Sequence, residues 1–105
     1  MANANSGCFE SAYRVYKTSL LRLRIRGIDR DEVKRILLTP REIYHDVLTG
    51  NFVAIGRRIR RESHWLIVVY TRYNDGYYVI TVIDTKSLDR IIQRRISSGK
   101  WVRVW

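Results

Sequence analysis

The sequence predicts an α+β domain in which two N-terminal helices and a C-terminal helix pack against an antiparallel sheet of three to four strands. Three observations lead to this prediction. Apolar residues after Asp29 follow a helical spacing. Two apolar runs are separated by Asn74-Asp75-Gly76, which is typical of a hairpin turn. A second helical spacing runs from Ser87 to Ser97 and stops before Gly99.

The chain is long enough for one domain. It has 105 residues, of which 46% are hydrophobic, and this suffices for one compact core. Residues 1–8 are small and polar, so we expect a disordered N-terminus there. Residues 9–105 are expected to form the single α+β domain.

The first predicted helix, over residues 19–28, rests on an ambiguous pattern. Leucine and isoleucine alternate with arginine there, as in a strand, whereas a helix would place Arg22 and Arg26 one turn apart. Ser19 as a cap and Gly27 as a stop favour the helix.

The second predicted helix begins at a clearer signal. Asp29 is expected to cap it, with Glu32 in the capping-box position. Val33, Ile36 and Leu37 fall on one face of this helix. Thr39-Pro40 is expected to end it, because the residue before proline avoids the helical conformation.

A connecting stretch over residues 41–51 is expected next, closed by a turn at Thr49-Gly50-Asn51. Three strands are predicted after it, over Phe52–Arg60, Trp65–Tyr73 and Tyr77–Asp84. The charged end of the first suits a partly exposed or edge strand, and the unbroken apolar run of the second suits a central one. The last helix is predicted to bury Leu88, Ile91, Ile92 and Ile96, and the alternating tail 100–105 to form a short terminal strand.

The charge balance indicates a polyanionic partner. Twenty Lys and Arg face ten Asp and Glu, for a formal net charge of +10. Sixteen of the twenty are arginine, whose planar fork of donors binds phosphate in two places. A salt-bridged surface is the alternative, but ten acids cannot pair twenty bases. An anionic membrane is a weaker rival, because the charges are not confined to one amphipathic helix.

Two basic clusters carry the predicted nucleic-acid contacts. One lies at the end of the first strand and the other in the C-terminal helix and tail, and together they comprise Arg57, Arg58, Arg60, Arg61, Arg94, Arg95, Lys100 and Trp101. Aromatic residues are interleaved with these charges. Because aromatic rings stack on unpaired bases, RNA is favoured over DNA as the partner.

Few residues offer catalytic chemistry. His45 and His64 are the only histidines, and either could move a proton in RNA cleavage, although a lone histidine is more often a surface or capping residue. The scattered acids disfavour a metal site, and no motif predicts a cofactor. The single Cys8 is consistent with a reducing cytoplasm. The N-terminus lacks signal-peptide features and the longest apolar run, Trp65–Tyr70, is short, so we expect no membrane contact.

Two segments resemble the small RelE/ParE-like toxins related to BrnT, many of which are catalogued as a domain of unknown function. The first is Arg22-Leu-Arg-Ile-Arg26-Gly27-Ile28-Asp29, followed by Glu32-Val33, Leu38 and Pro40. The second is Trp65–Arg72 with the Asn-Asp-Gly turn and Tyr78–Asp84. The match covers roughly residues 10–105 in pattern and not in a signature string, and it favours the helical interpretation of residues 19–28.

The resemblance implies a metal-independent ribonuclease toxin, or a relative that lost the activity. It places Arg22 and Arg26 on the first-helix arginines and Arg72 and Thr81 on the hairpin. Thr18 stands where relatives often carry a histidine, so His64 or His45 would have to take the role of that histidine. We take His64, together with Arg22, Arg26 and Arg72, as the candidate catalytic set. A non-catalytic regulator or adaptor is the alternative, and the candidate protein partners are an acidic antitoxin-like protein and a second copy of the chain.

Overall fold

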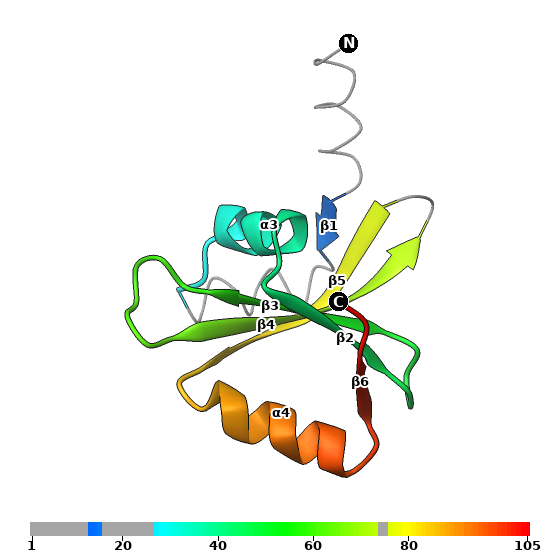
Figure 1. Ribbon diagram of the computed structural model, residues 1–105. Coiled ribbons are helices and arrows are strands. Elements are labelled where there is room, and N and C mark those ends of the chain that lie inside the picture. Colours follow the sequence, from blue (N-terminus) through cyan, green and yellow to red (C-terminus); the bar gives the residue numbers. More distant parts are fainter. Residues whose placement is uncertain (1–12, 16–26, 74–75) are drawn as a thin grey trace.

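The computed structural model describes residues 13–15, 27–73 and 76–105 (Figure 1). Over these ranges the strands form one sheet of six, in the order β1-β5-β4-β3-β2-β6. Helix α3 covers one face of the sheet and helix α4 covers the other (Figure 1). The elements are β1 (Tyr13–Val15), α3 (Arg30–Leu38), β2 (Glu42–Asp46), β3 (Phe52–Arg57), β4 (Trp65–Tyr73), β5 (Gly76–Thr85), α4 (Leu88–Ser97) and β6 (Trp101–Arg103).

The predicted fold class is wrong in its arrangement. The described residues are mostly β, with five strands in antiparallel pairs, β1 added in parallel to β5, and one helix on each side of the sheet. Among these residues α3 is the only helix that precedes β2, and the sheet has six strands in place of the expected three to four. Most of the predicted helix over 19–28, and the N-terminus 1–8, lie outside the described residues.

Strand β2 is the main element that the sequence did not predict. It occupies the stretch expected to be a connection, and it pairs with β3 on one side and β6 on the other. Only Tyr44 of its five residues is buried, packing against Trp101 with ring centroids 5.7 Å apart. With one buried residue flanked by partly buried ones, the sequence of β2 carries no clear alternation. Asp46 closes the turn after it by accepting the N–H groups of Leu48 and Thr49.

Helix α3 begins as predicted. The Asp29 carboxylate accepts the N–H of Asp31 at 2.9 Å, and Val33, Ile36 and Leu37 are buried against the sheet. Glu32, expected to complete a capping box, instead directs its carboxylate to Arg58. The helix therefore delivers an acid to the sheet as well as an apolar face.

Strand β3 is an interior strand and not an edge strand. It lies between β2 and β4, and its residues 53–56 are all buried. It ends at Arg57, three residues before the predicted end, because Arg58 turns inward to the carboxylates described below. At Gly56 the backbone lies against Ile36 so closely that a β-carbon would overlap that side chain.

The hairpin of β4 and β5 and the C-terminal elements follow the prediction more closely. Leu66 and Val68 of β4 pack on the α3 side and Ile67 packs on the α4 side, so β4 is covered on both faces. Helix α4 buries Leu88 and Ile92, but Ile96 remains 47% exposed, contrary to its predicted place on the buried face. Gly99, at φ 72°, ends the helix region and β6 follows. No helix in the described ranges is long and apolar enough to cross a membrane.

Candidate nucleic-acid interface

One end of the sheet gathers several chain segments. Arg57 at the end of β3 is paired with Trp65 at the start of β4, and Trp65 is paired with Thr85 at the end of β5. Helix α4 begins three residues after Thr85. The same end receives the start of β2, because the Arg41 N–H donates to the carbonyl of Ile55 at 2.9 Å. Side chains far apart in the sequence therefore meet around Trp65.

Two guanidinium groups lie against the indole of Trp65. The Arg41 guanidinium carbon is 4.7 Å from the ring centroid, and that of Arg57 is 5.6 Å from it. Trp65 is partly buried against the α4-side core, whereas both arginines are exposed. Each cation is attracted to the electron-rich face of the indole, which fixes its position at the surface.

Trp65 and Arg41 also line a surface pocket of about 500 Å³, which we call the Trp65 pocket. Its described lining is Arg41, Trp65, Lys86, Ser87, Leu88, Asp89 and Arg90. Three cations thus face one acid, Asp89. Such an excess attracts anions and raises the rate at which a polyanion associates.

The positive charge continues from the Trp65 pocket along α4. Arg90 and Arg94 are four residues apart on the helix, so they lie on one side of it. Arg95 follows, with its guanidinium 5.6 Å from the Trp101 ring centroid. We call the exposed set Arg41, Arg57, Lys86, Arg90, Arg94 and Arg95 the α4-side cations. A row of this kind suits successive phosphates of a nucleic-acid strand.

Arg58, predicted to contact nucleic acid, is buried in an ionic network. Its Nε and Nη2 donate to the two oxygens of Glu32 at 3.2 and 3.1 Å, and its Nη1 donates to Asp84. Its Nη2 also donates to the carbonyl oxygen of Gly27 at 3.3 Å. Only 5% of the Arg58 side chain is exposed, so this guanidinium joins α3 to the sheet and does not face solvent. Burial alone would lower the pKa of Arg58, but the Glu32 and Asp84 carboxylates raise it above its usual value.

His64 belongs to the same network. Its Nδ1 lies 2.6 Å from Oδ1 of Asp84, and Arg61 lies 3.5 Å from Oδ2 of the same carboxylate. Burial alone would raise the pKa of Asp84, but hydrogen bonds from His64 and Arg58 and the charge of Arg58 hold it below the usual range. An ionised Asp84 accepts a hydrogen bond from Nδ1–H of His64, and in this tautomer Nε2 of the imidazole is the nitrogen that can accept a proton.

A tight turn aims His64 at Asp84. The His64 N–H donates to the carbonyl oxygen of Arg61, and the Arg58 N–H donates to that of His64. Ser63 between them has φ 64°, in the left-handed region that few non-glycine residues adopt. The surrounding hydrogen bonds hold this strained turn, so the imidazole is oriented by backbone and side chain together.

The other predicted site residues are dispersed. Arg22 and Arg26 lie outside the described residues. Arg72 lies near the far end of β4, about 25 Å from His64 at the rise of an extended strand, so the two do not meet. Arg60 lines a different hollow beside Asp29, Asp31 and Glu32. Trp101 is 5% exposed and packs on Tyr44, whereas Lys100 is exposed.

Arg41, Lys86 and Trp65 were not among the predicted site residues. Arg41 and Lys86 stand in the segments just before β2 and just before α4, and Trp65 opens β4. The strand order could have revealed this site, because antiparallel strands bring the segments before β2 and before α4 to one end of the sheet. This reasoning requires strand β2, which the sequence did not predict. Among the described residues, no group of three or more His, Cys, Asp or Glu could hold a metal ion.

No protein-family model, curated protein or solved structure matches this chain.

Proposed function

We propose that this protein binds nucleic acid, RNA in preference to duplex DNA, through the Trp65 pocket and the α4-side cations. The observation that carries the proposal is the indole of Trp65 flanked by Arg41 and Arg57, beside a pocket whose described lining holds three cations and one acid. Phosphates are attracted by the cations, and this attraction is independent of base sequence.

The preference for RNA follows from the aromatic and guanidinium planes. Unpaired bases stack on aromatic rings and on arginine guanidinium groups, and paired bases inside a duplex cannot. The guanidinium groups of Arg41 and Arg57 lie over the Trp65 ring and are exposed, so they offer further planes for stacking. Single-stranded RNA can therefore use both the cations and the planar groups, whereas duplex DNA uses the cations alone.

The test compares two double variants with equal loss of charge. Arg41→Gln with Arg90→Gln removes two cations of the Trp65 pocket. Lys34→Gln with Arg60→Gln removes two on the α3 side, where Arg60 stands among acids. Binding of a fluorescent single-stranded RNA is measured by anisotropy at fixed salt. We expect the first pair to weaken binding about tenfold or more and the second to have a much smaller effect.

Equal weakening by both pairs would mean that the charge surplus acts without a defined site, which contradicts the proposal. Unchanged RNA binding in the Trp65-pocket pair would contradict it as well. A duplex DNA of the same length, bound as tightly as the RNA, would refute the stated preference.

A second candidate, metal-independent RNA cleavage, is favoured by one observation. Asp84 orients His64, and an oriented imidazole is a group that can take a proton from a 2′-hydroxyl. The resemblance to RelE/ParE-like toxins points to the same chemistry. The test incubates RNA in EDTA, with and without ribosomes, using the wild type, His64→Ala and His45→Ala. Cleavage lost only in His64→Ala supports this candidate, and intact RNA in every sample rejects it.

A further inference from the structure

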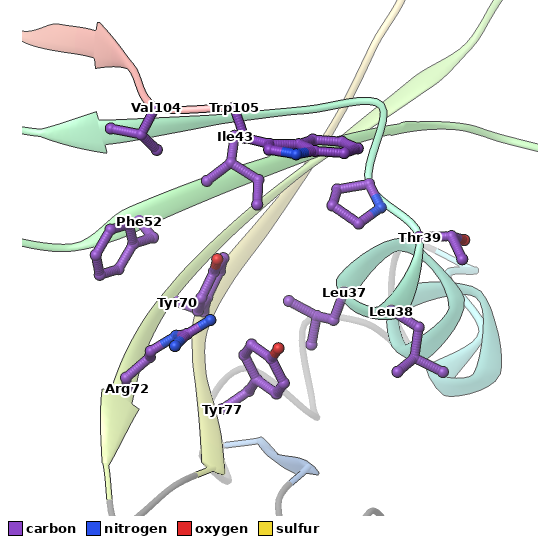
Figure 2. A pocket seen from close by; sticks show the side chains of 11 residues that line it. Leu37, Leu38, Thr39, Ile43, Phe52, Tyr70, Arg72, Tyr77, Val104 and Trp105 are labelled. Atoms are coloured by element: carbon purple, nitrogen blue, oxygen red, sulfur yellow. The ribbon is translucent and has the colours of Figure 1, made fainter.

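A cavity of about 670 Å³ lies on the α3 side of the sheet, far from Trp65 (Figure 2). We call it the aromatic pocket. Its described lining is Leu37, Leu38, Thr39, Pro40, Ile43, Phe52, Tyr70, Arg72, Tyr77, Val104 and Trp105. The volume falls within the range of small-molecule sites, and the lining is mainly apolar with a few polar groups, as such sites require.

Three rings form the wall of the aromatic pocket. Phe52 and Tyr70 stack with centroids 5.7 Å apart and planes inclined by 26°. Tyr77 meets Tyr70 edge-on at 5.4 Å. Ring faces and edges in this arrangement favour a planar ligand, because offset stacking and edge contacts add to the burial of apolar area.

The hydroxyl of Tyr70 points to a ligand with a polar group. Tyr70 is only 2% exposed, and it is one of the residues that line the aromatic pocket. Burial, followed by the neighbouring Tyr77, raises the pKa of Tyr70, so the hydroxyl keeps its proton and remains a donor. Because polar groups inside a protein are nearly always hydrogen-bonded, a polar group of a ligand in the cavity is a suitable partner for this hydroxyl.

Arg72 supplies the charge at the aromatic pocket. It is the only charged residue in the described lining, and Figure 2 shows its side chain among Tyr70 and Tyr77. Its guanidinium carbon is 5.6 Å from the Tyr77 ring centroid. Within the ranges that the structure describes, no carboxylate forms an ion pair with Arg72. An anionic ligand group would find there a fixed fork of donors without a competing acid.

We infer that the aromatic pocket binds a planar, largely apolar molecule with a single negative charge, such as an aromatic carboxylate or sulfonate. The ring lies against Phe52, Tyr70 and Tyr77, and the anionic group accepts from Arg72 and the Tyr70 hydroxyl. A phosphate monoester is disfavoured, because two negative charges would face one guanidinium. The inference does not depend on nucleic-acid binding, since the two sites lie at opposite ends of β4.

The test uses two fluorescent probes that share one ring system and differ in charge. Anilinonaphthalene sulfonate carries one negative charge, and N-phenyl-naphthylamine carries none. We expect saturable binding of the sulfonate at one site per chain. Arg72→Gln is expected to weaken the sulfonate about tenfold or more, because a charge-assisted hydrogen bond is lost, while binding of the neutral probe stays within about twofold because the apolar walls remain.

Two further variants complete the design. Tyr70→Phe keeps the ring and removes the hydroxyl, and we expect it to weaken the sulfonate but not the neutral probe. Arg94→Gln removes a charge on the opposite side of the sheet and should change neither. Equal weakening of both probes by Arg72→Gln, an equal effect of Arg94→Gln, or the lack of saturable sulfonate binding would overturn the inference.

Discussion

Arginine and aromatic side chains lie together near both ends of β4, yet the surroundings of the two ends differ. At its start, Trp65 lies beneath two exposed guanidinium groups and next to a pocket with further cations. Near its finish, Arg72 is the only charged residue in the described lining of an apolar cavity. The first arrangement suits a chain of phosphates with unpaired bases, and the second suits one small monoanion.

Arg58 adds a third arrangement, because it is buried between Glu32 and Asp84. Arginine thus has three different surroundings in this protein. Arg58 joins two elements, the arginines at Trp65 are exposed to a polyanion, and Arg72 lines a cavity. Burial and the number of nearby carboxylates distinguish these roles. The total charge, which first indicated a polyanion, does not.

The largest effect is expected from Arg58→Met, which leaves the Glu32 and Asp84 carboxylates without their buried partner. Breaking such a pair costs about 3–5 kcal/mol of unfolding free energy, measured by urea denaturation. Arg61→Met is the matched control, because Arg61 contacts the same Asp84 from an exposed position and such pairs contribute about 0–1 kcal/mol. A loss for Arg58→Met as small as the one expected for Arg61→Met would show that Arg58 is not a structural group.

The next effect concerns pH. The pKa of folded Asp84 lies below its usual value of about 4. Its stabilising contribution is therefore complete above that value and is lost as the pH falls from there through the folded pKa. Urea denaturation at several acidic pH values should show the wild type and Asp84→Asn converging as pH falls. Parallel profiles would contradict this assignment.

A pair of substitutions is expected to separate the two ends of β4. Trp65→Leu keeps apolar packing but removes the plane for stacking, so RNA affinity should fall about tenfold, in line with the loss of one base stack. Sulfonate binding at the aromatic pocket should not change. Arg72→Gln should weaken sulfonate binding and leave RNA binding nearly unchanged. If each variant impaired both ligands, the two ends would form one site.

The smallest effect is expected in the salt dependence of RNA binding. Each phosphate contact of a single strand contributes about 0.7 to the slope of log affinity against log salt. The double variant Arg41→Gln with Arg90→Gln should therefore reduce the slope by about 1.4, whereas the Lys34→Gln with Arg60→Gln pair should preserve it. Anisotropy titrations over a range of salt concentrations give the slope. An unchanged slope in the first pair would place the phosphates elsewhere.

Local signals predicted the elements whose side chains follow a regular pattern. The cap at Asp29, the apolar face of α3 and the hairpin of β4 and β5 were all visible in the sequence. Strand β2 was not, because only Tyr44 of its five residues is buried and one of its two neighbours, β6, lies more than fifty residues further along the chain. The pairing of β2 with β6 depends on the fold and leaves no periodic pattern in either segment.

The candidate sites were predictable only in part. A run of arginines after β3 indicated nucleic acid, but it could not reveal that Arg58 turns inward while Arg57 stays outside. That difference depends on Glu32 and Asp84, each 26 residues from Arg58. The aromatic pocket joins α3, four strands and the C-terminal tail, so no local stretch of sequence contains it.

Gly56 sets the clearance between helix and sheet. With no side chain at this position, Ile36 rests directly on the β3 backbone. Ile36 and Glu32 are one turn apart on α3, so the depth at which the isoleucine seats also determines how far the glutamate extends toward Arg58. A single methyl group at Gly56 would push α3 away from the sheet. The contact between Glu32 and Arg58, which is two residues along the chain from Gly56, would then lengthen first.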